Sequence, residues 1–211
     1  MSANAAWAKA WMVECANVVG VHREELIDLD RAIGDADHGE NLDRGFNAVV
    51  ASLADKAFAT PSEVFKTVSM TLMSNVGGAY GPLVGTAFLR ASTVSKDAEE
   101  LDASVLADVI AAAAEGIQAR GRAELGEKTM LDAWLPAAEA AKAAADTGKS
   151  PIDTLKAAAS AAQTGAEATD AMTARKGRAS YLGSRSVGHR DPGAQSTAYI
   201  LDAAARTLEK A

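Results

Sequence analysis

Helix start signals followed by apolar residues four positions apart are the feature that most restricts the fold of this chain. In TPSEVFKTVSMTLMSNVGG (60–78), Thr60 predicts an N-cap, Pro61 takes the first helical position and Glu63 completes a capping box. Apolar residues then recur at every fourth position and form one helix face, namely Val64, Val68, Leu72 and Val76. Gly77 and Gly78 end this predicted helix.

The same signals recur along the chain. The segment SPIDTLKAAASAAQTGAEA repeats the start pattern with Ser150, Pro151 and Asp153. Further helices are predicted over 4–20, 22–33, 41–57, 82–95, 102–120, 130–146 and 194–210, with loops near 74–81, 121–129 and 176–193. No segment shows the two-residue period of a strand, and alanine, the best helix former, is abundant. We therefore predict an all-α fold, a single domain over residues 1–211 with about eight helices in a compact antiparallel bundle or helical barrel.

Charge and composition restrict the partners and the compartment. The 28 acidic residues outnumber the 21 basic ones, giving a net charge of −7, which disfavours nucleic-acid binding. No segment approaches the length of a membrane span, and the N-terminus lacks the cationic start of a signal peptide. The single cysteine, Cys15, excludes an intrachain disulfide framework, fits a reducing cytoplasm and is expected to fill space on a helix.

Several common phosphate and calcium motifs do not fit. The stretch TGKS (147–150) resembles the end of a P-loop, but Ala143 stands where the first glycine is required. The stretch GEKT (126–129) has Glu127 at a required glycine position, and no strand precedes either stretch. An EF-hand loop beginning at Asp35 fails because Glu40 and Phe46 occupy its invariant glycine and glutamate positions.

An acidic cluster in DLDRAIGDADHGENLDRGF (28–46) is the strongest candidate for chemistry. Asp30 is predicted near a helix end, Gly34 stops that helix, and Asp35 and Asp37 follow in an extended loop. Asn41 is expected to cap the next helix. Hard carboxylate oxygens beside a helix N-terminus suit Mg²⁺ bridging to phosphate, although a helix stop, a turn and a cap in one loop explain the same residues equally well.

Two further loops favour a phosphate ligand. The stretch SNVGGAYGPLVGTAF (74–88) has four glycines ahead of a helix, more than a tight turn requires. The stretch ARKGRASYLGSRSVGHRDPGAQS (174–196) gathers a basic group, namely Arg175, Lys176, Arg178, Arg185 and Arg190. Because glycines are interspersed and a helix follows, we expect this group to contact phosphate.

Four blocks of sequence together resemble a known family, the nucleotide-binding L subunits of dihydroxyacetone kinases. They are GDADHGENLDRGF, GGAYGPLVGTAF, GEKTMLDAWLPA and KGRASYLGSRSVGHRDPGAQS, and they span nearly the whole chain. The resemblance is to the phosphotransferase-dependent bacterial type. It implies an antiparallel eight-helix barrel with Mg·ADP, or Mg·ATP, held by the loops at one rim.

The resemblance also implies roles for particular residues. Two Mg²⁺ ions would be held by three carboxylates, those of Asp30, Asp35 and Asp37. The nucleotide would contact residues of all four blocks, namely His38, Gly39, Asn41, Ala79, Tyr80, Gly121, Met130, Arg178, Asp191, Pro192 and Gly193. Arg178 would touch phosphate and act as the catalytic residue. His38, Gly39 and Asn41 would follow the phosphate, whereas Gly121 and Met130 would bracket the adenine.

The chain departs from the family pattern at three positions. Tyr80 stands where Ser is usual, and a bulky ring cannot replace a small hydroxyl that touches phosphate. The ring would instead stack on the ligand, alter its pose or suit a different ketose partner. Glu127 replaces the usual Asp and Ser184 the usual Glu, and we expect small effects from both because neither is among the implied metal ligands.

The resemblance implies a relay between subunits. A separate K subunit would hold dihydroxyacetone, an M subunit would carry phosphohistidine and rephosphorylate bound ADP, and the L subunit would be inactive alone, with a homodimer as a further possibility. Two alternatives remain open. One is an L-type subunit that uses exchangeable ATP for another ketose such as erythrulose, and the other is a nucleotide-sensing regulatory partner that catalyses nothing.

Overall fold

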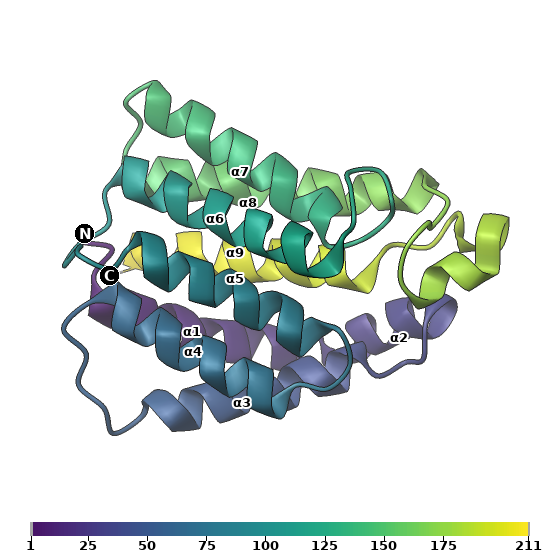
Figure 1. Cartoon of the computed structure of the whole chain (residues 1–211), viewed down its shortest axis with the longest axis horizontal. Helices are drawn as coiled ribbons and strands as arrows, with labels where there is room; N and C mark the ends of the chain where they lie inside the picture. Colours follow the sequence, from purple (N-terminus) through teal and green to yellow (C-terminus); the bar gives the residue numbers. More distant parts are fainter. Residues whose placement is uncertain (1, 211) are drawn as a thin grey trace.

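Nine α-helices and two short 3₁₀-helices form the described part of the chain, residues 2–210, in a computed structural model (Figure 1). The α-helices are α1 (Ala5–Val21), α2 (Arg23–Ile33), α3 (His38–Leu53), α4 (Pro61–Asn75), α5 (Tyr80–Val94), α6 (Ala103–Gly121), α7 (Leu131–Asp146), α8 (Pro151–Ala168) and α9 (Pro192–Lys210). The 3₁₀-helices η1 (Thr169–Ala171) and η2 (Arg178–Ser186) lie between α8 and α9. Over these residues the structure has no strand, which confirms the all-α prediction.

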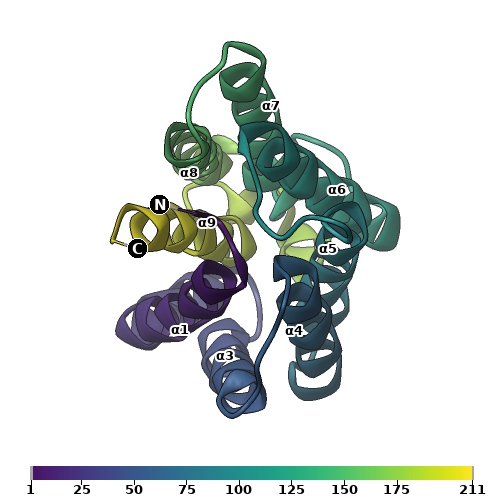
Figure 2. The ribbon, with the colours of Figure 1, turned by 90° about the vertical axis from the view of Figure 1, so that its left-hand side faces the viewer.

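The helices pack in a closed circuit (Figure 2). Starting at α1, the chain of contacts runs through α3, α4, α5, α6, α7 and α8 to α9, which returns to α1, while α2 lies against α3 and η2. One large cluster of buried apolar side chains connects the eight helices of this circuit. The prediction of a barrel, like that of a single domain over 1–211, stays a prediction.

Two tryptophans of α1 tie the first helix to the last. Trp7 and Trp11 stack with ring centroids 5.3 Å apart, and their indole N–H groups donate to backbone carbonyls of α9, those of Ala204 and Ile200. Trp11 also meets Phe65 of α4 edge-on. Because buried aromatic pairs contribute beyond their buried area, this cluster anchors the closure of the circuit. Cys15 is buried on the same helix, as predicted.

Alternating chain direction places the helix starts at two opposite ends of the molecule. The starts of α4, α6 and α8 lie at the end that carries both termini, whereas α3, α5, α7 and α9 begin at the other end (Figure 1). At the first end, side chains cap each start: Thr60 accepts from the Glu63 amide, Asp102 from the Val105 amide and Ser150 from the Asp153 amide. None of the described helices is both long and apolar enough to span a lipid bilayer.

Candidate functional site

A pocket of about 450 Å³ lies at the end where α3, α5, α7 and α9 begin. Its size is that of a typical small-ligand site. The lining includes every metal- and nucleotide-binding residue that the family resemblance implied except Gly39, that is Asp30, Asp35, Asp37, His38, Asn41, Ala79, Tyr80, Gly121, Met130, Arg178, Asp191, Pro192 and Gly193. The fold therefore brings together residues from all four sequence blocks.

The three aspartates converge at one side of this pocket. Asp30, Asp35 and Asp37 each offer a carboxylate oxygen, and these oxygens all lie within 4.8 Å of one another. Burial raises the pKa of Asp30, and the nearby charges of Asp35 and Asp37 raise it further, while the two backbone amides that it accepts from oppose the shift. Like charges held this closely favour a cation between them.

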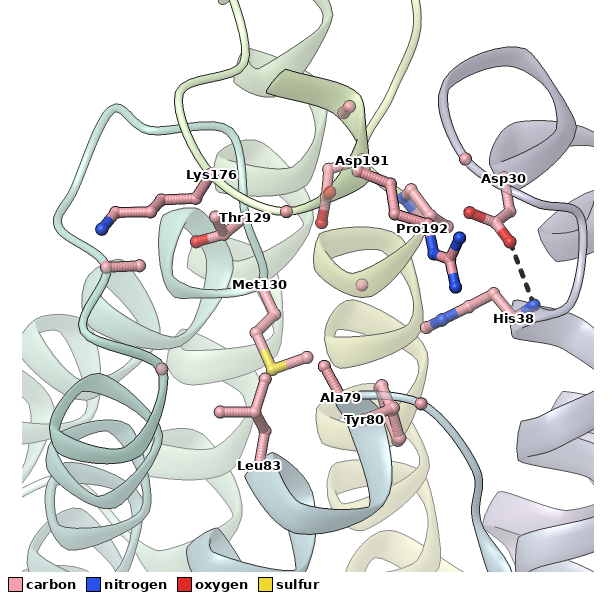
Figure 3. Close-up of a pocket in the computed structure, with 18 of the residues that line it drawn as sticks. Asp30, His38, Ala79, Tyr80, Leu83, Thr129, Met130, Lys176, Asp191 and Pro192 are labelled. Carbon is pink, nitrogen blue, oxygen red and sulfur yellow. Dashed lines mark hydrogen bonds between the residues drawn. The ribbon is translucent and has the colours of Figure 1, made fainter. Parts of the chain in front are cut away.

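Asp30 also caps α3, which corrects the prediction that Asn41 would do so. One oxygen of Asp30, Oδ2, accepts from the backbone N–H groups of Asp37 at 2.9 Å and His38 at 3.2 Å (Figure 3). The helix consequently begins at His38. Asn41 lies within α3, where its side-chain oxygen accepts from Arg44 at 2.6 Å. The sequence missed this because the capping carboxylate comes from the preceding helix.

Two glycines of this region have packing roles. A Cβ at Gly34 would lie 2.0 Å from Oδ1 of Asp30, so only glycine leaves room for the second oxygen of that carboxylate. A Cβ at Gly39 would lie 2.3 Å from the carbonyl oxygen of Arg23. Gly39 therefore allows close contact between α2 and α3, and it lies outside the pocket lining.

The start of α5 presents free backbone amides to the pocket. Its N-cap position, Ala79, has no side-chain capping bond, and Gly77 and Gly78 precede it along the pocket wall. Gly78 has φ +66°, a conformation that favours glycine. Uncapped N–H groups with the positive end of the helix dipole form a natural site for an anion.

His38 is a neutral wall residue rather than a cation. Burial lowers its pKa to about 3. Its Nε2 lies 3.0 Å from Oγ of Ser196, and that hydroxyl donates its only proton to the carbonyl of Gly193. A hydrogen bond with the backbone of Pro192 raises the pKa of His38, but the effect of burial is larger. A neutral imidazole adds no positive charge beside a phosphate.

Tyr80 lies in the pocket lining and in the core at the same time. Its side chain is buried, and its ring meets that of His38 edge-on at 5.0 Å. The Tyr80 hydroxyl is shielded from solvent and has no hydrogen-bond partner within residues 2–210. The nearby Ser196 lowers the pKa of Tyr80, but only in part. Burial raises the pKa of Tyr80 far above its ordinary value. The ring therefore supports His38, and its hydroxyl is not available to a ligand.

The other side of the pocket is apolar. Its lining includes Pro82, Leu83, Ile117, Ala123, Met130 and Leu131. Figure 3 shows Met130 beside Leu83, with the carboxylate of Asp191 pointing into the pocket above them. A Cβ at Gly193 would lie 3.3 Å from that of Met130, so glycine permits this helix start to approach Met130. The apolar side suits a flat aromatic ring.

Asp191 caps α9 while it faces the pocket. Its Oδ2 accepts from the Ala194 amide at 2.7 Å. Burial raises the pKa of Asp191 to about 7, and the charge of Asp132 adds to this shift, while the Ala194 bond and Lys128 oppose it. The carboxyl group therefore changes its protonation near neutral pH.

The basic group divides, which corrects the prediction that it contacts phosphate as a unit. Arg178 forms an ion pair with Asp35 at 2.9 Å. Lys176 lines the pocket but extends along the side of Thr129, away from Asp30 (Figure 3). Arg190 is paired with Asp170 at 2.9 Å. The remaining two members, Arg175 and Arg185, are exposed outside the lining.

Several lining residues were not predicted. The apolar residues could not be distinguished from core positions by their spacing, and Lys128, which is 1% exposed, carried no recognisable signal in GEKT. Glu127 and Ser184, the other two departures from the family pattern, lie outside the lining. Glu127 closes its own loop by accepting from the Glu124 amide at 2.9 Å.

The fold and the pocket define the class of this protein, a helical bundle whose end pocket combines a carboxylate cluster, an uncapped helix start and an apolar side. A sequence profile described as the DAK2 domain matches residues 32–206, and the chain belongs to this family.

Known proteins resemble the chain over most of its length. It is 44% identical over 191 residues to the PEP-dependent dihydroxyacetone kinase, ADP-binding subunit DhaL, of Escherichia coli K12, covering 90% of this chain and 91% of the relative. It is 34% identical to the L-erythrulose 1-kinase of Mycolicibacterium smegmatis, covering 93% of this chain but 36% of the relative. The crystal structure of the dihydroxyacetone kinase of C. freundii matches with a TM-score of 0.73 at 26% identity, over 97% of this chain and 35% of that one.

Proposed function

We propose that this chain is the ADP-binding subunit of a dihydroxyacetone kinase and that it presents a phosphoryl group to a ketose on a separate K subunit. One observation carries the proposal: three carboxylate oxygens within 4.8 Å of one another share a single pocket with the uncapped start of α5. The identity to the ADP-binding subunit of E. coli over nine-tenths of both chains supports it.

The donor set fits Mg²⁺. All three groups of the acidic cluster are carboxylates, the hard oxygen ligands that Mg²⁺ prefers. Asp30 uses Oδ2 to hold two backbone amides, and Gly34 leaves space beside Oδ1, so this oxygen is the one for a metal. We propose that Asp30, Asp35 and Asp37 hold two Mg²⁺ ions. Bound there, the ions would neutralise the phosphate oxygens, which is the main requirement of phosphoryl transfer.

The two sides of the pocket orient the nucleotide. The phosphates would lie against the acidic cluster and the uncapped start of α5 at Gly78, Ala79 and Tyr80. The adenine would lie on the apolar side, where Met130 and Gly121 both line the pocket. Asp191, Pro192 and Gly193 close over the nucleoside, and Asn41 lies beside Gly77 at the phosphate end.

Arg178 is the proposed catalytic residue. Its side chain is 68% exposed and its only ion pair in residues 2–210 joins it to Asp35 at the metal site. With Asp35 engaged as a metal ligand, the Arg178 guanidinium would be free to contact the transferring group. A positive group placed there stabilises the charge of the transition state, and its loss costs on the order of 10²–10³ in rate.

The proposal includes the partners and the compartment. The K subunit supplies the ketose, and an M subunit with phosphohistidine rephosphorylates ADP, as the name of the E. coli relative, a PEP-dependent kinase, suggests. We also propose that the protein is cytoplasmic and that it forms a homodimer.

One observation favours erythrulose as a second candidate substrate, namely the 34% identity of this chain to an L-erythrulose 1-kinase.

Reconstitution tests the function. The purified chain is mixed with a cognate K subunit and with either ATP or a phosphohistidine donor, and phosphorylation of dihydroxyacetone and erythrulose is measured. We expect activity only with the K subunit present. Bound ADP that survives dialysis favours the phosphotransferase-dependent form, whereas free exchange with ATP favours the ATP-dependent alternative. If neither ketose reacts with either donor although Mg·ADP binds, the chain is a nucleotide-sensing partner instead.

A further inference from the structure

Lys128 is a buried cation in the pocket wall that the proposed function does not use. Its side chain is 1% exposed, and its backbone has φ +62°, a conformation that non-glycine residues rarely adopt. Burying an ammonium group is costly unless strong hydrogen bonds compensate. Both features persist only where the surrounding contacts determine them.

The ammonium group of Lys128 joins three segments. Its Nζ donates to the carbonyl of Thr169, at the end of α8, at 2.5 Å and also to the carbonyl of His189 in the loop before α9. Burial lowers the pKa of Lys128, and the nearby carboxylates of Asp191, Asp170 and Asp132, in that order, oppose the shift. A cation at the end of α8 also interacts favourably with that helix dipole.

These contacts surround Asp191. Lys128 bonds to the carbonyls of Thr169 and His189, and both residues lie next to Asp191. The hydroxyl of Thr169 accepts from the Asp191 amide at 3.0 Å. His189 precedes Asp191 by two positions in the sequence. Lys128 itself lies two residues before Met130, and both residues line the pocket. One side chain therefore links the loop of Met130 to both supports of Asp191.

We propose that Lys128 is a positioning residue for the nucleoside half of the site, fixing Asp191 and the start of α9 against Met130. This inference rests on the proposed function, because it assumes a nucleotide in the pocket. The acidic cluster lies on α2 and the loop that follows it, and neither hydrogen bond of Lys128 reaches it. Loss of Lys128 should therefore harm nucleoside binding and leave binding at the metal end intact.

Calorimetry with two ligands tests this division. Mg·ADP and Mg·pyrophosphate are titrated into the full chain and into Lys128→Met, which keeps the length of the side chain but removes the charge. We expect Lys128→Met to bind Mg·ADP about tenfold or more weakly, because small displacements of positioning groups are costly. Its affinity for Mg·pyrophosphate should match that of the unchanged protein. The matched control is Lys149→Met, at an exposed lysine between α7 and α8, and it should leave both affinities unchanged.

A second variant keeps the test decisive if Lys128→Met does not fold. Thr169→Val removes the hydroxyl that holds the Asp191 amide but leaves Lys128, and it should weaken Mg·ADP alone by about threefold. Equal losses for both ligands, or no loss for Mg·ADP, would overturn the role of Lys128 while the proposed function stands. If the unchanged protein binds neither ligand, the proposed function itself fails.

Discussion

The two ends of the bundle begin their helices in different ways. At the end that carries the termini, Thr60, Asp102 and Ser150 bond to amides of their own helices and close them. At the pocket end, Asp30 of α2 caps α3 from the preceding helix, Asp191 caps α9, and Thr129 accepts from the first amide of α7. Among the described starts of α3, α5, α7 and α9, that of α5 alone has no side-chain bond. A capped start satisfies its amides locally, whereas an open start keeps them for another partner. The difference leaves the amides of the α5 start for a ligand.

Removing one metal ligand tests the pocket end most severely. Asp35→Asn should weaken Mg·ADP binding by about 100-fold or more, because the metal loses one of three carboxylates that hold it. The fold should remain and the unliganded protein should be no less stable, since one of three repelling charges is gone. Calorimetry with Mg·ADP and thermal unfolding measure the two effects. Asp55→Asn, on an exposed aspartate just beyond α3, is the control, and unfolding of Asp35→Asn would favour a purely structural loop instead.

Adding a negative charge at the open start of α5 should raise the stability of the unliganded protein and weaken nucleotide binding. Ala79→Asp puts a carboxylate at the N-cap of α5, where the helix dipole should stabilise the unliganded protein by about 0.5 kcal/mol. The same charge occupies the proposed phosphate position, so Mg·ADP should bind about tenfold more weakly. Urea unfolding and calorimetry give both values. Unchanged affinity would show that phosphate does not use this helix start.

The pH dependence of stability should also come from the pocket end. The folded pKa of Asp191 is about 7, above the ordinary value, so the folded protein holds a proton that the unfolded chain has released. Without metal or nucleotide, the free energy of unfolding should fall by about 3 kcal/mol as pH rises from 4 to 7 and level off above about pH 8. Asp191→Asn keeps the oxygen that caps α9 and should remove most of this dependence of the unfolding free energy on pH, as measured by urea unfolding at several pH values. Asp30, whose pKa is also raised, should account for the pH dependence that remains. An unchanged slope in the variant would assign it to other groups.

The smallest effect is expected at the capped end. Thr60→Ala removes the bond to the Glu63 amide and should lower the free energy of unfolding by about 1 kcal/mol. Because α4 starts far from the pocket, Mg·ADP affinity should stay the same. A clear loss of affinity would show that the two ends are coupled through the bundle.

The same contrast explains how far the sequence could predict the structure. Helix starts at the end that carries the termini were placed within one residue, as at Pro61 and Pro151, because the signal and the structure are local. The starts of α3, α5 and α9 were predicted at 41, 82 and 194 but lie at 38, 80 and 192. At α3 the cap is Asp30, a side chain from the preceding helix, and at α5 there is none.

The candidate site shows the same limit. Asp30, Asp35 and Asp37 are close in sequence, so their grouping could be foreseen, and the structure brings their oxygens together. Lys128 could not be foreseen, because its role depends on carbonyls 41 and 61 positions away. The hidden hydroxyl of Tyr80 likewise follows from packing in three dimensions.

The ion pair between Arg178 and Asp35 has a consequence for the order of events. The protein carries its own counter-ion at the acidic cluster, so on the proposed function a divalent ion would compete with a tethered guanidinium as well as with water. Arg178 opens the η2 segment, so the same ion pair ties the start of that segment to Asp35. An arginine released from Asp35 would then lie beside the position proposed for phosphate.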